Sequence, residues 1–371
     1  MNDFKTEDRI IKLKEEVFKS FDASGILIFK DEDIFYLSGF YGKSSGCVLL
    51  ITDKKNYLFV NFIYLEEAGK TATKNGFEIV RYAVEKNIVI SETLKAQKIN
   101  TVLMQSDFIS YSHYIKLEAE FNEINIKVIN VDNPLKDLRL IKDNSEQNLI
   151  REACRLTDKS FDNICNLTYK DIINKKDSSL GLEIEKFLVD SGGGRKSFDY
   201  VIANNDNSSK PHYEPGNNKI NDGILLMDFG VIFKNYCSDI TRTIFIGGKI
   251  NSELKKIYEI VREAQLMAVD FCTEGIRACE LDNIARKYIT DMGYGDNFGH
   301  SLGHGIGLNV HEPPWINTQN DQILKEGMVI TIEPGIYIKN LGGIRIEDMV
   351  IVKKIGCENL YKSSKKAIQI Y

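Results

Sequence analysis

The sequence predicts two domains, an N-terminal α/β domain and a second domain that combines helices with strand-rich segments. A chain of 371 residues is too long for one typical domain and suits two. Ahead of Asn133-Pro134, short apolar strands alternate with segments of helical periodicity, which is typical of an α/β domain. Long helices and two hairpins that carry acidic residues follow this break. We therefore expect one domain at residues 1–137 and another at residues 138–371.

The elements of the first domain follow from hydrophobic periodicity. Six short apolar runs predict strands, at Gly25–Phe29, Cys47–Thr52, Asn56–Val60, Phe77–Tyr82, Ile99–Met104 and Ile126–Val131. Apolar residues at helical spacing predict three helices, at Glu7–Phe21, Tyr64–Lys74 and Ser112–Phe121. A further short element, of a type that the pattern leaves open, is expected at Phe35–Phe40.

The second domain begins with a long helix, which is expected from Ser145 to Leu167 with Asn144 or Ser145 as its cap. Other helices are expected near residues 180–190, 252–273 and 279–292. Gly293 is a suitable residue to end the last of them.

The composition excludes several classes of protein. The net charge is −5 at pH 7 and no long basic run occurs, which argues against a nucleic-acid or anionic-membrane binder. No apolar run reaches membrane-spanning length, and the polar residues Met1–Lys5 have no apolar signal segment behind them. The seven cysteines are scattered without a C-x-x-C pair, as is typical of reduced thiols. We therefore expect a cytoplasmic protein.

Histidines are rare in this chain, and they cluster. His300, His304 and His311 lie within residues 299–314, where four glycines and two prolines disfavour a regular helix. His212 lies further upstream, beside a proline. A lone histidine is more often structural. Three in one glycine-rich loop indicate a site if acidic partners exist, because neutral imidazole is a common metal ligand and acid–base group.

Two predicted hairpins supply such acidic partners. Asp228 lies in the apolar strand Leu225–Gly230, and Asp239 follows eleven residues later on the return strand. Glu333 ends a β-branched strand, and Glu347 follows fourteen residues later. Each acid alone could face solvent on an edge strand. A carboxylate inside an apolar strand is costly to bury, however, unless it is paired or binds a cation.

Four carboxylates and one imidazole match the ligands that a pair of hard or borderline divalent ions needs. No cysteine lies at these positions, which disfavours a structural zinc site. Bridging carboxylates can hold two ions ~3.5–4 Å apart and let them share a hydroxide. Ligation by oxygen and nitrogen alone suits Mn(II), Co(II) or Fe(II), with Zn(II) as a further alternative.

The motifs MDFG, SDITRT, GHGIGLNVHEPP, TIEPG and GGIRIED resemble the metallopeptidase family with the pita-bread fold, which includes aminopeptidase P, Xaa-Pro dipeptidase and methionine aminopeptidase. The resemblance covers residues 138–371 and implies an α+β pita-bread catalytic domain. The first domain resembles, more weakly, the α/β N-terminal domain of creatinase, prolidase and aminopeptidase P. The resemblance also implies two divalent ions, for which we favour Mn(II), and five ligands: Asp228, Asp239, His304, Glu333 and Glu347.

The resemblance gives each ligand a role. Asp228 would bind one ion, His304 and Glu333 would bind the other, and Asp239 and Glu347 would bridge both. Glu333 would also carry a proton from the attacking water to the leaving nitrogen.

The remaining histidines match family positions that act on the substrate. His212 matches the histidine that helps to hold the substrate, and His311 matches the one that stabilises the tetrahedral intermediate. His300 either orients the loop through a hydrogen bond or contacts the substrate.

Two further residues share strand faces with the ligands. Arg345 lies two residues before Glu347, where it either forms an ion pair that orients a carboxylate or is exposed to solvent. Thr241 shares the face of Asp239 and can form a hydrogen bond near the metals.

The implied activity is hydrolysis of the Xaa-Pro bond at peptide N-termini by a metal-bridged hydroxide. The N-terminal domain disfavours methionine aminopeptidase, and creatinase lacks these ligands. We favour an Xaa-Pro aminopeptidase over an Xaa-Pro dipeptidase (prolidase), because compact two-domain bacterial-type members often resemble the former. Two further hypotheses are a non-catalytic peptide-binding homologue and an amidohydrolase of non-peptide bonds. The resemblance also implies a homodimer or homotetramer that acts on proline-containing peptides.

Overall fold

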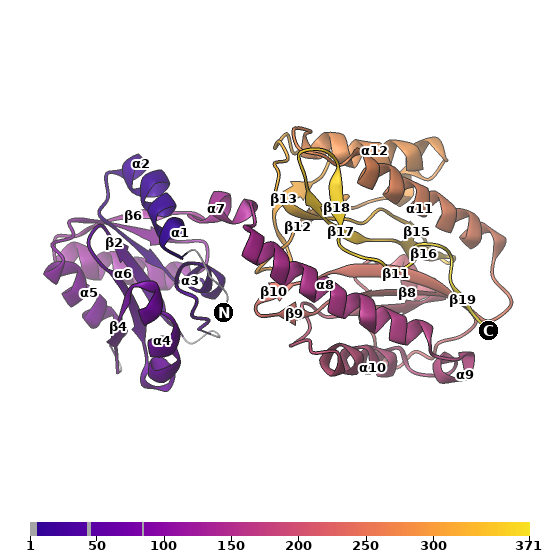
Figure 1. The fold of residues 1–371 in the computed structure, drawn as a ribbon, viewed down its shortest axis with the longest axis horizontal. Coiled ribbons are helices and arrows are strands. Elements are labelled where there is room, and N and C mark those ends of the chain that lie inside the picture. The colour runs from indigo at the N-terminus through magenta and orange to yellow at the C-terminus, as the bar shows by residue number, and fades with distance from the viewer. Residues whose placement is uncertain (1–5, 43–45, 84) are drawn as a thin grey trace. The chain divides into compact units, whose positions relative to one another are not determined.

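A computed structural model describes residues 6–42, 46–83 and 85–371 of the chain. The first five residues, on which the expectation of a polar start rests, lie outside the described residues. The chain divides into two compact units, Met1–Arg139 and Leu140–Tyr371 (Figure 1). The described part of the chain contains no helix long and apolar enough to cross a membrane.

The first unit is built on one six-stranded mixed sheet of strand order β4-β3-β2-β1-β5-β6. Its strands are β1 Gly25–Ile28, β2 Val48–Thr52, β3 Asn56–Val60, β4 Phe77–Arg81, β5 Thr101–Gln105 and β6 Lys127–Val131. β1, β2 and β3 pair antiparallel, whereas β1–β5, β5–β6 and β3–β4 pair parallel. All six expected strands are present, and their ends differ from the expectation by at most two residues.

Helices flank this sheet. They are α1 Thr6–Leu13, α2 Lys19–Phe21, α3 Asp31–Ser38, α4 Leu65–Thr71, α5 Lys86–Ala96 and α6 Tyr111–Glu123, with short π or 3₁₀ turns at Lys14–Phe18, Phe62–Tyr64 and Thr73–Asn75. Helix α7, Lys136–Leu140, follows β6 and includes the last residues of this unit. The expected element Phe35–Phe40, whose type was left open, overlaps α3, which begins at Asp31 and ends at Ser38. This helix is buried on nearly all sides and therefore has no amphipathic pattern. Helix α5 was not expected, because its β-branched run Ile88–Ile90 does not read as helical.

The second unit contains two larger sheets and two small ribbons. The four-stranded sheet has the order β19-β11-β8-β7, with β7 Val201–Asn204, β8 Gly223–Phe229, β11 Ile240–Ile246 and β19 Gln369–Ile370. The five-stranded sheet has the order β13-β12-β14-β17-β18, with β12 Gly303–Gly305, β13 Glu312–Ile316, β14 Val329–Ile332, β17 Asp348–Val352 and β18 Cys357–Asn359. The ribbons pair β9 Ile232–Phe233 with β10 Tyr236–Cys237, and β15 Gly335–Ile338 with β16 Gly342–Arg345.

The helices of this unit are α8 Asn144–Cys165, α9 Tyr169–Ile172, α10 Asp177–Asp190, α11 Ser252–Phe271 and α12 Ala278–Asp291. The expected cap of α8 was wrong, since the cap is Asp143 rather than Asn144 or Ser145. The Asp143 carboxylate accepts the amides of Ser145 and Glu146, and the Glu146 carboxylate accepts the amide of Asp143. This reciprocal capping box needs a Glu three residues after the cap, and Asp143 has one there. Gly293, at φ +90°, follows the end of α12 as expected.

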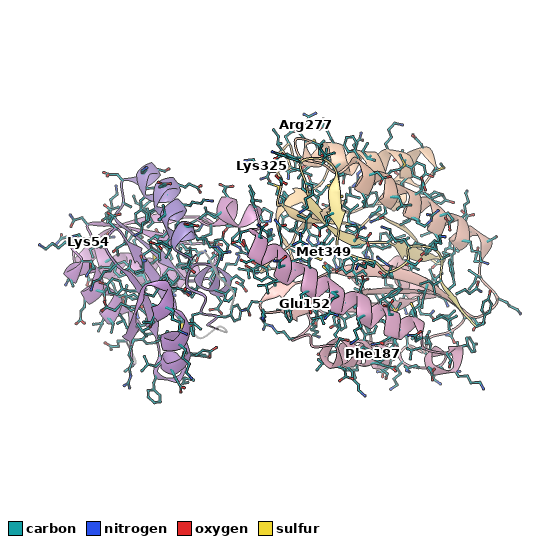
Figure 2. All side chains as sticks on the ribbon, viewed as in Figure 1. Lys54, Glu152, Phe187, Arg277, Lys325 and Met349 are labelled. Atoms are coloured by element: carbon teal, nitrogen blue, oxygen red, sulfur yellow. The ribbon has the colours of Figure 1, made fainter. Side chains whose placement is uncertain are left out.

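Helices α11 and α12 lie side by side and form the core of this unit with the strands (Figure 1). Val261 and Ala285 of the two helices are buried in one cluster with Ile330 of β14 and Val350 of β17. Met349, on the same strand as Val350, lies inside the unit, whereas Arg277 and Lys325 lie at its surface (Figure 2). This packing fixes the strands whose ends carry the acidic residues.

Candidate metal centre

The first acid-bearing hairpin is formed by β8 and β11. Asp228 lies near the end of β8, opposite Thr241, and Asp239 immediately precedes β11. Lys234 and Asn235, with φ of +47° and +73°, turn the chain between the short strands β9 and β10. The two carboxylates therefore lie at the same end of the four-stranded sheet.

The second hairpin pairs β14 with β17, with Ile332 opposite Asp348. Glu333 and Glu347 are thus neighbours at the point where the chain leaves this ladder for the ribbon β15–β16. His304 comes from β12, which pairs with β14. A Cβ on Gly303 would lie 2.0 Å from the Thr331 carbonyl oxygen, so this close approach of β12 requires glycine.

These residues converge on one cavity of about 330 Å³, which all five expected ligands line. Asp239, His304 and Glu347 each offer a ligand atom within 4.8 Å of the others, and all three are buried. His304 Nε2 lies 3.3 Å from Glu333 Oε1 and 3.8 Å from Asp239 Oδ2. Its Nδ1 donates to the Gly305 carbonyl at 3.0 Å, which leaves Nε2 facing the carboxylates.

The buried carboxylates lie close enough together to shift one another's pKa values. Burial, followed by the charges of Glu347 and Asp228, raises the pKa of Asp239 well above its ordinary value. Burial and the charge of Glu333 likewise raise the pKa of Glu347. Burial also opposes the charge on Glu333, but the hydrogen bond and charge of His304 outweigh it and lower that pKa to about 2.

The donor set fits divalent cations. Asp228 Oδ1 and Asp239 Oδ1 are buried and make no hydrogen bond within the described structure. Buried, unpartnered carboxylate oxygens are costly, and a coordinated cation removes that cost. The donors are all oxygen or imidazole nitrogen, which suits hard or borderline ions.

Arg345 and Thr241 hold the carboxylates in place. The Arg345 guanidinium is buried and pairs with Asp228 Oδ2 at 2.5 Å, so its partner is Asp228 rather than Glu347. Its Nε also donates to Thr241 Oγ1 at 3.0 Å. Thr241 in turn donates to Glu347 Oε2 at 2.7 Å. One chain of contacts therefore links carboxylates from both hairpins.

The other histidines line the same cavity. The rings of His311 and His304 are 4.4 Å apart, and the side chains of His311 and His212 are exposed. His300 Nδ1 donates to the Ser301 carbonyl at 2.8 Å, and its Nε2 lies 3.0 Å from the Tyr337 hydroxyl. His300 thus makes a loop-orienting hydrogen bond and also faces the cavity.

Tyr337 is a residue of the site that sequence reasoning missed. Its hydroxyl accepts from Arg345 Nη1 at 2.9 Å and contacts His300. It lies on β15, between the two acidic residues of the second hairpin. Tyr337 is four residues after Glu333, so an extended chain places both side chains on the same face, and this spacing was the available signal. Only the pairing of β15 with β16 brings it beside Arg345.

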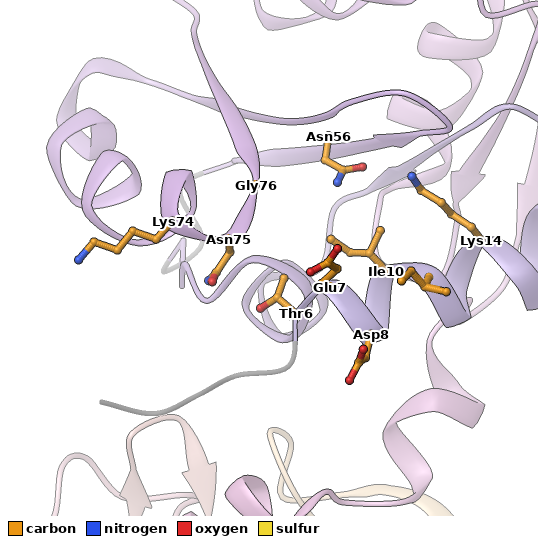
Figure 3. A pocket seen from close by; sticks show the side chains of 10 residues that line it. Thr6, Glu7, Asp8, Ile10, Lys14, Asn56, Lys74, Asn75 and Gly76 are labelled. Atoms are coloured by element: carbon orange, nitrogen blue, oxygen red, sulfur yellow. The ribbon is translucent and has the colours of Figure 1, made fainter.

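A larger cavity of about 670 Å³ lies in the first unit (Figure 3). Its lining mixes acids such as Glu7 with Lys14, Lys74 and amide side chains. Among the described residues, the group that could hold a metal ion lies in the second unit, at Asp239, His304 and Glu347. We therefore place the candidate site in the smaller cavity.

Curated relatives resemble this chain over nearly its full length. The Xaa-Pro dipeptidase of Pyrococcus horikoshii is 36% identical over 364 residues, which cover 97% of this chain and 99% of the relative. The putative Xaa-Pro aminopeptidase of Mycoplasma genitalium is 34% identical over 366 residues, which cover 96% and 98%.

Solved structures share the fold. The Xaa-Pro dipeptidase from Bacillus anthracis matches with a TM-score of 0.92 and 36% identity, covering 99% of this chain and 100% of that one. The X-Pro aminopeptidase from Thermotoga maritima matches with a TM-score of 0.87 and 31% identity, covering 95% and 99%. The expected fold class, an α/β N-terminal domain followed by a pita-bread catalytic domain, is confirmed.

Two family descriptions match the two parts of the chain. Residues 9–141 match the creatinase/prolidase N-terminal domain, and residues 148–354 match metallopeptidase family M24. Family membership implies bound divalent metal ions, in agreement with the buried cluster of acids and histidine. The expected family is thereby confirmed, and the chain belongs to metallopeptidase family M24.

Proposed function

We propose that this protein is an Xaa-Pro aminopeptidase, which removes the first residue from peptides that have proline in second position. The observation that carries the proposal is the convergence of five potential ligands, from two hairpins and a loop, on one cavity. The names of the relatives, Xaa-Pro dipeptidase and Xaa-Pro aminopeptidase, indicate which bond is cleaved.

The ligand assignment follows the family pattern. Asp228 would bind one ion, His304 and Glu333 the other, and Asp239 and Glu347 both. We propose Mn(II) as the native metal, with Co(II), Fe(II) and Zn(II) as alternatives that the same donors accept. When bound, the two ions would lower the pKa of water and polarise the scissile carbonyl.

The chain's own side chains would complete the reaction. Glu333 would accept a proton from the attacking water and deliver it to the leaving proline nitrogen. His311 would donate a hydrogen bond to the oxyanion that develops on the scissile carbonyl, and His212 would hold the substrate. Arg345 and Thr241, through their contacts with Asp228 and Glu347, would keep the carboxylates oriented.

The charges that line the cavity favour an aminopeptidase over a dipeptidase. A dipeptide brings the proline carboxylate into the cavity, where it needs a cation. Among the described lining residues, Arg345 carries the one permanent positive charge, and it is already paired with Asp228. Trp315, which is 45% exposed, provides an apolar wall instead. Peptides that continue beyond proline need no such cation. The dipeptidase alternative is supported by the names of the Pyrococcus relatives.

A comparison of substrate lengths tests this proposal. The purified protein with added Mn(II) is incubated with Ala-Pro, Ala-Pro-Ala and Ala-Ala-Ala, and free amino acids are followed by mass spectrometry. Release of alanine from Ala-Pro-Ala is expected. Cleavage of Ala-Pro alone would make the protein a dipeptidase, and cleavage of Ala-Ala-Ala would refute proline specificity. An inert protein would favour the non-catalytic or amidohydrolase hypothesis.

We further propose a cytoplasmic homodimer or homotetramer. The seven cysteines are free thiols, which suits a reducing compartment. Light scattering during size-exclusion chromatography will give the mass of the assembly. A monomer at micromolar concentration would contradict this proposal.

A further inference from the structure

A buried ion pair, Lys142 with Glu312, lies beneath the loop that carries His311. Lys142 Nζ is 2.8 Å from Glu312 Oε1, and the two side chains are 1% and 8% exposed. The contact is an attraction between charges rather than an aligned hydrogen bond. Neither residue is a metal ligand or lines the cavity, so the proposed chemistry does not use them.

The backbone around Lys142 fixes where its charge lies. The Lys142 amide donates to the Gly327 carbonyl at 3.0 Å, and its carbonyl accepts from Gln147 Nε2 at 2.8 Å. Asp143, the next residue, caps α8. The backbone of Lys142 is therefore fixed by the start of a long helix and by the segment just before β14, and this limits where its ammonium group can lie.

Glu312 connects this fixed charge to two of the histidines of the site, His304 and His311. It directly follows His311, and its backbone pairs with Gly305, the residue after His304. Its second carboxylate oxygen accepts the Asn309 amide at 3.3 Å. A Cβ on Gly307 would lie 2.6 Å from Glu312 Oε1 and 3.0 Å from Lys142 Cε, so the loop passes directly over the ion pair.

Buried ion pairs contribute little net stability, because desolvation offsets the attraction, and their best use is to specify one arrangement. The arrangement specified here is that of residues 305–312. The exposed His311 depends on this backbone for its place beside His304, 4.4 Å away between ring centres.

We propose that Lys142 is a positioning residue that acts through Glu312 to hold His311 over the cavity. This inference rests on the role proposed for His311 in the Xaa-Pro peptidase reaction. It predicts a defect in turnover without a matching defect in metal or substrate binding.

The test compares Lys142→Met with a double variant, Lys142→Met with Glu312→Met, which leaves no unpaired buried charge and is therefore expected to fold. For both we expect kcat on Ala-Pro-Ala to fall about tenfold or more, with KM within about twofold of wild type. Calorimetric Mn(II) affinity and the melting temperature of the metal-free double variant should stay near wild type. Lys142→Arg, which keeps the charge, should restore part of kcat.

Two controls separate positioning from general damage. Lys175→Met breaks an ion pair with Glu183 on α10, away from the cavity lining, and should leave kcat unchanged. In a His311→Ala background, Lys142→Met should lower kcat no further, because the group through which it acts is gone. A double variant with wild-type kcat, or a full additional loss in that background, would overturn the inference. If the wild-type protein cleaves no Xaa-Pro peptide, the proposed function fails and the inference fails with it.

Discussion

An Asp239→Asn substitution removes one negative charge from the buried carboxylate cluster and keeps the size of the side chain. Asp239 lies within ligand distance of His304 and Glu347, and its Oδ1 has no hydrogen-bond partner in the metal-free protein. An amide is a much weaker ligand for hard divalent ions than a carboxylate. We therefore expect both Mn(II) affinity and turnover of Ala-Pro-Ala to collapse.

The same substitution should change stability in opposite directions with and without metal. An ion at a hundred times its Kd stabilises the folded state by about 2.7 kcal/mol. Since 1 kcal/mol shifts the melting temperature of a domain of this size by roughly 2–4 °C, each bound Mn(II) ion should raise the wild-type value by roughly 5–11 °C. In the variant this rise should vanish. Without metal the variant should melt above wild type at neutral pH, because burial and the neighbouring Glu347 disfavour a charge at position 239.

Differential scanning fluorimetry of both proteins, in chelator and in Mn(II), measures these shifts, and the peptide assay measures turnover. Circular dichroism establishes that the variant is folded. A variant that retains the full Mn(II) shift and wild-type turnover would refute the two-metal assignment.

Four further predictions concern the site and its supports. Glu333→Ala should abolish turnover while the protein stays folded, as the peptide assay and circular dichroism will check; activity near wild type would remove Glu333 from the chemistry. Arg345→Met leaves Asp228 without its cation and should weaken Mn(II) binding about 10–100-fold by calorimetry; unchanged affinity would contradict the orienting role. In the metal-free protein the raised pKa values of Asp239 and Glu347 mean that the folded state keeps protons that the unfolded chain releases above about pH 4. The free energy of unfolding measured in urea should therefore fall as the pH rises from about 5 to 8. A free energy of unfolding that rises over this range would contradict the raised pKa values. Asp143→Ala removes the cap of α8 and should cost about 1 kcal/mol, or roughly 2–4 °C in melting temperature by scanning fluorimetry; an unchanged melting temperature would contradict the capping role.

The sequence predicted the positions of strands better than the partners of individual side chains. Alternating and apolar runs gave all six strands of the first unit, because their burial leaves a direct signal in residue type. Helix α5 was not predicted, because its β-branched run favours a strand locally. Its packing against α6 favours the helix instead. The cap of α8 was misplaced by one or two residues because Asp143, Asn144 and Ser145 are all good caps, and only the reciprocal bond with Glu146 separates them.

The same limit applies to the site. Motif spacing predicted that the ligand candidates lie close together, because the pairing of two strands in a hairpin fixes which of their residues are neighbours. The partner of Arg345 did not follow from the strand that carries it, since Asp228 reaches it from the other sheet. Tyr337 was missed for a similar reason, because its place depends on side-chain reach across the ribbon β15–β16.

The single guanidinium among the carboxylates sets the charge balance of the centre. Four ionised carboxylates and Arg345 leave three net negative charges when His304 is neutral. One divalent ion would reduce this to a single negative charge, which would still attract a second cation. A second divalent ion would leave one positive charge, which a hydroxide shared by the two ions would neutralise. With two ions and one hydroxide the proposed centre would therefore be neutral overall, and a third cation would gain nothing from it.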